Sequence, residues 1–84
     1  MFKNLWIYDN EAQVIALHRP ELYDSLTEEE KSELIHMNDF EGLAFAVIDE
    51  KAVAVIEDLT GDVIEEFKSI DEFIAATLAY IRAE

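Results

Sequence analysis

Two apolar runs separated by a short charged break constrain the fold of this chain more than any other part of its sequence. Residues 43–48 and 52–56 contain only Ala, Val, Ile, Leu and Phe, and Asp49-Glu50-Lys51 lies between them. The shortness of the runs and their β-branched residues favour strands over a helix. We therefore predict two antiparallel strands joined by a tight turn.

Alternation along these strands gives the predicted hairpin two apolar faces of different size. If both runs are extended, one face carries the larger side chains and the other is rich in alanine. We expect the larger face to form the main core. Strands that are apolar throughout are typical where both faces are buried, so we expect a helix or a second copy of the protein to cover the alanine-rich face. The larger face consists of Leu43, Phe45, Val47, Val53 and Val55.

The C-terminal part of the sequence has the clearest helical pattern. Ser69 and Glu72 have the spacing of a capping box, in which two side chains satisfy backbone groups at a helix start. An amphipathic stripe follows, and we predict a helix over about 70–83 that packs on the sheet. The stripe is formed by Ile70, Phe73, Ile74, Thr77, Leu78 and Ile81. Thr27 and Glu30 form a second such box, which predicts a helix over about 28–37.

Further strands are expected on both sides of these elements. Residues 5–8 and 13–18 have strand-like composition and flank a polar, turn-prone segment, so they predict a first hairpin. Residues 63–68 are expected to form the last strand. In that strand Val63 and Phe67 share a parity that Ile64 lacks, which predicts a bulge near Glu65-Glu66 or partial burial of both faces.

These elements predict a single α+β domain spanning residues 1–84. The expected architecture has two layers, a mostly antiparallel sheet of four to five strands and two helices, in the order β-β-α-β-β-β-α. A chain of 84 residues is too short for a second domain with its own core. No apolar run approaches the ~20 residues of a membrane helix, and the N-terminus lacks the pattern of a signal peptide. We expect a cytoplasmic protein.

The charge of the chain favours some partners over others. Twenty acidic residues against six Lys and Arg give a formal net charge of −14. Such a surface repels DNA, RNA and anionic membranes, and it attracts basic protein surfaces. Solubility is the simpler explanation of the same charge.

Residues suited to catalysis or to cofactor binding are few. The chain has no cysteine, which excludes disulfides, thiolate nucleophiles and zinc–thiolate sites. Its two histidines, His18 and His36, have no motif that links them to a nucleophile. Only Gly42 and Gly61 are present, so no glycine-rich phosphate loop can form. We therefore expect no enzyme activity, no cofactor and no dedicated metal site.

Two functional hypotheses follow. The first is an acidic protein-interaction module, in the form of an inhibitor or a nucleic-acid mimic, that presents carboxylates to a basic partner such as a nucleic-acid-binding protein. The second is an assembly module that forms a homodimer through an apolar sheet face. Trp6 and Tyr8 are aromatic candidates for a contact surface, although core packing is the favoured explanation of both. The candidate partner-binding residues are Glu28, Glu29, Glu33, Asp49, Glu50, Glu57, Asp58, Asp62 and Glu66.

Overall fold

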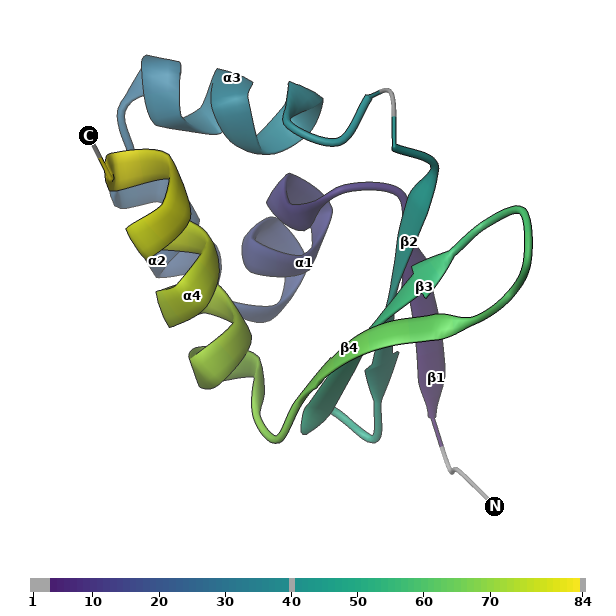
Figure 1. Ribbon diagram of the computed structural model, residues 1–84. Coiled ribbons are helices and arrows are strands. Elements are labelled where there is room, and N and C mark those ends of the chain that lie inside the picture. Colours follow the sequence, from purple (N-terminus) through teal and green to yellow (C-terminus); the bar gives the residue numbers. More distant parts are fainter. Residues whose placement is uncertain (1–3, 40, 84) are drawn as a thin grey trace.

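An antiparallel four-stranded sheet with helices on one side forms the protein (Figure 1). The computed structural model describes residues 4–39 and 41–83. Neighbouring strands lie in the order β1-β2-β3-β4, and each pair is antiparallel. The predicted α+β class is therefore confirmed. The elements are β1 (Leu5–Tyr8), α1 (Glu11–His18), α2 (Pro20–Ser25), α3 (Glu28–His36), β2 (Leu43–Ile48), β3 (Ala52–Glu57), β4 (Val63–Phe67) and α4 (Ile70–Arg82).

The predicted strand at residues 13–18 is wrong, because this segment belongs to helix α1. Asn10 caps the helix: its side chain accepts a hydrogen bond from the Gln13 backbone N–H at 2.9 Å. The Gln13 side chain in turn accepts one from the Asp9 backbone N–H at 2.8 Å. These two capping hydrogen bonds start a helix that buries Val14 and Ile15 completely. A short apolar run fits a buried helix as well as a strand, and here the cap decides.

The element order and the number of helices change accordingly. The described residues form four strands and four helices in the order β-α-α-α-β-β-β-α, not the predicted β-β-α-β-β-β-α with two helices. Pro20 stands at the first position of α2, where its missing N–H costs nothing. The side chain of Arg19, between α1 and α2, is 2.9 Å from the Asp71 carboxylate of α4. This contact ties the inserted helices to the C-terminal helix.

The central hairpin forms as predicted. Phe45 pairs with Val55 and Val47 with Val53 across β2 and β3, and all four side chains belong to the buried core. Helix α4 packs over this face, where the Phe45 and Phe73 rings lie 5.7 Å apart. The larger face is therefore the core face, as expected.

The turn between β2 and β3 has an unusual backbone. Asp49 and Glu50 have φ angles of 54° and 59°, in the left-handed region that favours glycine. The Lys51 N–H donates to the Ile48 carbonyl at 3.0 Å and closes the turn. Ile48 pairs with Ala52, so only three residues connect the strands. The two positive φ angles let the chain reverse within this short connection, which outweighs the local strain of the two acidic residues.

Strand β4 carries the predicted irregularity. Ile56 pairs with Val63, but its neighbour Val55 pairs with Glu65, so Ile64 is the extra residue of a bulge. Residues two apart on a strand share a face, so Glu65 lies on the same face as Phe67, whose ring lies 5.4 Å from that of Phe73. A carboxylate thus occupies the core side of an edge strand.

Candidate functional site

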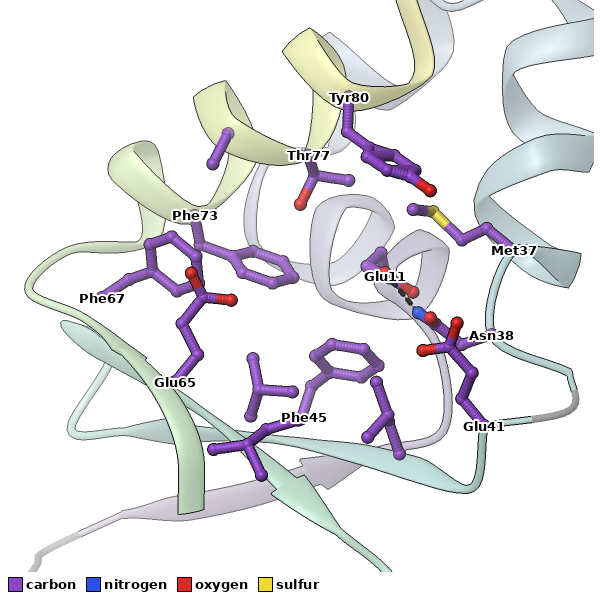
Figure 2. A pocket seen from close by; sticks show the side chains of 14 residues that line it. Glu11, Met37, Asn38, Glu41, Phe45, Glu65, Phe67, Phe73, Thr77 and Tyr80 are labelled. Carbon is purple, nitrogen blue, oxygen red and sulfur yellow. Dashed lines mark hydrogen bonds between the residues drawn. The ribbon is translucent and has the colours of Figure 1, made fainter.

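A pocket of about 420 Å³ opens between α4, the core side of the sheet and the segment that joins α3 to β2 (Figure 2). Its inner wall contains buried side chains from three elements: Glu11 of α1, Phe45 of β2, and Phe73 and Thr77 of α4. We call it the Glu11 pocket. The remaining lining residues are Met37, Asn38, Glu41, Leu43, Val55, Ile64, Glu65, Phe67, Ala76 and Tyr80.

Glu11 is a buried carboxylate with one unsatisfied oxygen. Only 5% of the residue is exposed. Asn38 Nδ2 donates a hydrogen bond to Glu11 Oε2, whereas Oε1 has no hydrogen-bond partner among the described residues. An unpaired buried polar atom costs free energy, so a native site that keeps one invites a functional explanation.

Burial also perturbs the ionisation of this carboxylate. Removal from water raises the pKa of Glu11 above its ordinary value, and the negative charge of Glu41 adds to the rise. Its own backbone N–H and the Asn38 amide oppose the change, because both hydrogen bonds favour the charged form. The position of Glu11 in the first turn of α1 also favours a negative charge. Glu11 is thus a carboxylate that a bound cation would stabilise.

The mouth of the pocket carries two further carboxylates. Glu41 and Glu65 are exposed and lie on opposite sides of the opening in Figure 2. Glu65 lies on this side because it pairs with Val55, a residue of the core face. Tyr80, 71% exposed, completes the rim on α4. The described residues contain no group of three or more His, Asp or Glu side chains placed to hold a metal ion. The three pocket carboxylates therefore do not converge as metal ligands.

Three of the predicted partner-binding residues project from α3. Glu28, Glu29 and Glu33 are exposed there, and Glu29 and Glu33 lie one turn apart. Glu28 Oε1 is 3.8 Å from Lys31 Nζ, so one of these acids already has a basic neighbour.

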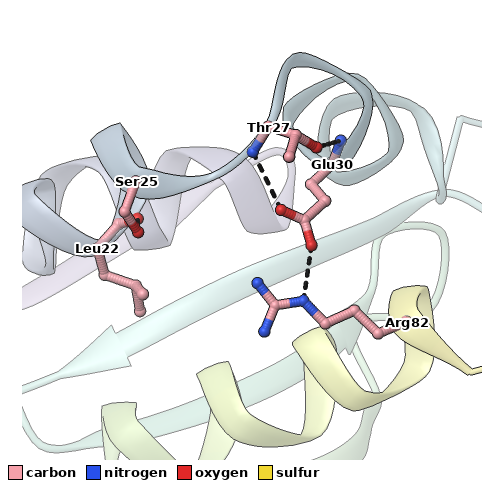
Figure 3. Close-up of polar contacts among 5 residues, drawn as sticks. All are labelled: Leu22, Ser25, Thr27, Glu30 and Arg82. Atoms are coloured by element: carbon pink, nitrogen blue, oxygen red, sulfur yellow. Dashed lines mark hydrogen bonds and ion pairs between the residues drawn. The ribbon is translucent and has the colours of Figure 1, made fainter.

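Glu30 of the same helix has an internal role instead (Figure 3). Its carboxylate accepts a hydrogen bond from the Thr27 backbone N–H at 3.0 Å and contacts Arg82 Nε at 2.6 Å. The hydrogen bond from Arg82 is the main reason why the pKa of Glu30 lies below its ordinary value. The predicted capping box is confirmed, and the ion pair joins α3 to the end of α4.

The other predicted acids lie at both ends of the central hairpin. Asp49 and Glu50 form the β2–β3 turn, whereas Glu57 and Asp58 stand at the far end of β3, roughly 20 Å away for six residues of strand. Asp62 lies beside Glu57, because the Glu57 N–H donates to the Asp62 carbonyl at 2.9 Å. Together with the α3 group, these acids form three separate groups and not one continuous band.

The alanine-rich side of the sheet faces away from all the described helices (Figure 1). Its edge side chains Leu5 and Ile7 are 54% and 56% exposed. The central alanines are nearly buried, because longer side chains stand beside them, such as Ile7 next to Ala46. Glu66, the last predicted partner-binding residue, pairs with Ala54 and lies on this side too. We call this surface the open face: Leu5, Ile7, Ala44, Ala46, Ile48, Ala52, Ala54, Ile56 and Glu66.

The aromatic and histidine candidates make contacts within the fold. Tyr8 is buried in the core and Trp6 packs against it, so both lie on the helix side of the sheet. The Tyr8 hydroxyl is 2.9 Å from His18 Nε2, and both rings meet His18 edge-on. Burial is the main cause of the lowered pKa of His18. His36 Nδ1 lies 2.9 Å from the Asp39 carboxylate at the end of α3.

Sequence reasoning missed the two residues that distinguish the pocket. Glu11 falls in the turn-prone segment expected between residues 5–8 and 13–18, so a prediction that makes 13–18 a strand does not bury it. The signal that could have revealed it is the spacing of Asn10 and Gln13, which is that of a capping pair. Glu65 shares its parity with Phe67, but the side of the sheet that both face depends on the register with Val53 and Val55, which the pattern alone leaves open.

Comparison with known proteins adds no family. No protein-family model matches the sequence, and neither curated proteins nor solved structures provide a match. Among the described residues, no helix has the length and apolar character required to cross a membrane.

Proposed function

We propose that this protein is a non-catalytic binding module that docks a basic protein on its open face and on the acidic turns beside it. The observation that carries this proposal is the one-sided covering of the sheet: the described helices all lie on one side, with α1 and α4 against the strands, while the apolar opposite face keeps exposed Leu5 and Ile7. Exposed apolar surface of this kind is typical of interaction sites.

The size of the open face supports a partner that also contacts charged residues. Four short strands present roughly 300 Å² in projection, from their spacing and rise. A stable protein interface buries about 800 Å² on each partner. A partner seated on the open face must therefore reach its surroundings, where Asp49, Glu50, Glu57, Asp58 and Asp62 lie at the two ends of the hairpin. Lys and Arg around an apolar patch would complement them.

A partner that normally holds nucleic acid fits this proposal, because its phosphate-binding surface is basic. The three separate groups of acids favour recognition of a positive rim over imitation of a regular phosphate backbone. An inhibitor would act by covering that surface. No chemistry by this chain is required.

A homodimer through the open face is the second candidate. It is supported by the same apolar surface, since Glu66 is the charged residue among those that make up the open face. The charge of −14 opposes it, since two copies would repel each other at low salt. Raised salt would therefore strengthen a homodimer, whereas it would weaken the complex with a basic protein.

Ile7→Asp tests the proposed interface. Ile7 is more than half exposed, so the change should leave folding nearly intact while placing a carboxylate on the open face. Leu17→Asp is the matched control, because Leu17 is 66% exposed and belongs to α1, on the helix side of the sheet and away from the proposed interface. A protein captured in a pull-down with the wild type should be purified. It is then titrated against the wild type and both variants by calorimetry at about 50 and about 500 mM NaCl, where charges are weakly and strongly screened, respectively.

The expected result is a basic partner whose affinity falls by about tenfold or more with Ile7→Asp and with raised salt, but not with Leu17→Asp. A neutral or acidic partner, or binding that Ile7→Asp leaves unchanged, would contradict the proposal. Sedimentation of the protein alone tests the second candidate: a dimer at micromolar concentration that Ile7→Asp dissociates would support it.

A further inference from the structure

The Glu11 pocket lies on the helix side of the sheet, away from the open face, and its inner end presents a single acceptor. Glu11 Oε1 is unpaired among the described residues, while Oε2 is already engaged by Asn38. The residue is 95% buried, being 5% exposed, so a ligand that reaches it must leave water. One free carboxylate oxygen suits a donor that is a compact point charge. A guanidinium fork would need both oxygens for its paired hydrogen bonds.

The walls between the inner end and the mouth are apolar and aromatic. Phe45, Phe67 and Phe73 line the pocket, and their rings form one contact series, with centroids 5.7 Å apart for Phe45–Phe73 and 5.4 Å for Phe67–Phe73. Aromatic walls accept an aliphatic stem, and their faces attract a cation. A cavity of about 420 Å³ is within the usual range for small ligands.

The mouth of the pocket also favours a positively charged ligand. Glu41 and Glu65 flank the opening, and no Lys or Arg is among the described residues that line the pocket. An anion would meet negative charge at the mouth and again at Glu11. A neutral apolar ligand would leave Glu11 Oε1 without a partner, which is costly in a buried site.

We propose that the Glu11 pocket binds a primary alkylammonium group, with the ammonium against Glu11 and its stem along the phenylalanine rings. The group can come from a free alkylamine or from a lysine side chain of a peptide, because both present the same ammonium on an aliphatic stem. The Thr77 hydroxyl on the inner wall offers a second oxygen for the ammonium protons.

Butylammonium is the probe that tests this site, with 1-butanol as its neutral counterpart of similar stem. Titrations followed by two-dimensional NMR at constant ionic strength should show saturable shifts at Glu11, Phe73 and Thr77 for butylammonium and weaker binding of 1-butanol. Glu11→Gln should lower the affinity about tenfold or more, since a hydrogen bond to a charged group is lost. Glu33→Gln makes the same charge change on exposed α3, outside the pocket, and should leave the affinity unchanged.

A second readout reports directly on contact with Glu11. Saturating butylammonium should lower the pKa of the Glu11 carboxyl, measured from its carbon chemical shift, because a nearby cation favours the charged form. Glu41, Glu65 and Tyr80 are the other titratable groups that line the pocket, and they should be followed in the same titration. If Glu11→Gln disturbs the amide spectrum, Glu65→Gln at the mouth replaces it and should weaken binding more than Glu33→Gln does.

A peptide with one lysine, compared with the same peptide carrying acetyl-lysine, separates the two sources of the ammonium. Binding of the lysine form alone indicates a peptide ligand, and binding of butylammonium without either peptide indicates a free amine. The proposal is overturned if butylammonium causes only unsaturable shifts, binds no better than 1-butanol, or binds Glu11→Gln and Glu33→Gln equally. Glu11 would then be a buried residue at the start of α1 whose Oε1 is hydrogen-bonded by water.

Discussion

Glu11 is the residue at which folding and binding requirements oppose each other. It stands at the start of α1, where a negative charge is favourable, yet it is nearly removed from water. Desolvation is the largest influence and raises its pKa. The folded protein therefore holds the Glu11 proton more tightly than the unfolded chain does. Ionisation at neutral pH consequently lowers the free energy of unfolding.

Glu11→Gln should change the stability of the protein in a pH-dependent way. Because the folded pKa is raised, the wild type loses stability as pH rises from the unfolded pKa through the folded one. Gln cannot ionise, so the melting temperature of the variant relative to the wild type should increase from pH 4 to pH 7.5. Calorimetric melting at several pH values measures this difference. A difference that stays constant or falls with pH would contradict the interpretation.

Among the elements, those with local signals were predictable and those that depend on burial were not. Helix α3 begins at its Thr27 box, and α4 begins where Ser69 accepts a hydrogen bond from the Glu72 N–H at 3.0 Å. Glu72 departs slightly from the predicted box, since its side chain accepts from the Lys68 N–H and not from that of Ser69. Such caps act within a few residues, so sequence alone reveals them.

Helix α1 shows why part of the fold could not be derived from composition. Its run Val14–Ile15 is buried on all sides between the sheet and the other helices, so the alternation that distinguishes a strand from a helix is absent. The same limit applies to the pocket, whose lining comes from five separate parts of the chain: α1, the α3–β2 segment, the central hairpin, β4 and α4. Only the packing of these elements brings Glu11, Glu41 and Glu65 to one cavity.

The β2–β3 turn offers a test at the scale of one element. A non-glycine residue in the left-handed region costs about 1–2 kcal/mol, while glycine also loses more freedom on folding, by about 0.4–1 kcal/mol. Because Glu50 has φ 59°, Glu50→Gly should raise the free energy of unfolding by about 0.5–1 kcal/mol. Glu57→Gly, which introduces glycine into regular strand β3, should lower it. Urea denaturation measures both, and a destabilised Glu50→Gly variant would show that the turn is not strained.

The whole molecule has two chemically different sides. One face of the sheet supports the helices, the core and the Glu11 pocket, and the other presents the open face between acidic turns. The sequence predicted both apolar faces and identified the larger one as the core. What covers the alanine-rich face depends on where the helices lie. This could not be predicted, because the segment that forms α1 was expected to be a strand. The described helices all lie on the core side (Figure 1).

The insertion of three helices between β1 and β2 has a consequence for the order in which the sheet forms. Strands β2, β3 and β4 follow one another through short turns, whereas β1 pairs with β2 only after the chain has closed a loop through α1, α2 and α3. Loop-closure entropy rises with loop length, so the three-stranded meander should assemble first and β1 should dock last. β1 is also a four-residue edge strand, so we expect it to detach first.

Native-state hydrogen exchange in low urea makes this order visible. The hydrogen-bonded amides of β1 should exchange through a partial opening, at a lower free energy than those of Val53 and Val55 in central strand β3. Equal protection of both strands would mean that the sheet opens only as a whole. A partial opening would release β1 and the exposed Leu5 and Ile7 with it, so the surface proposed to receive a partner would also be the least durable part of the sheet. A bound partner would then stabilise β1 against detachment from the sheet.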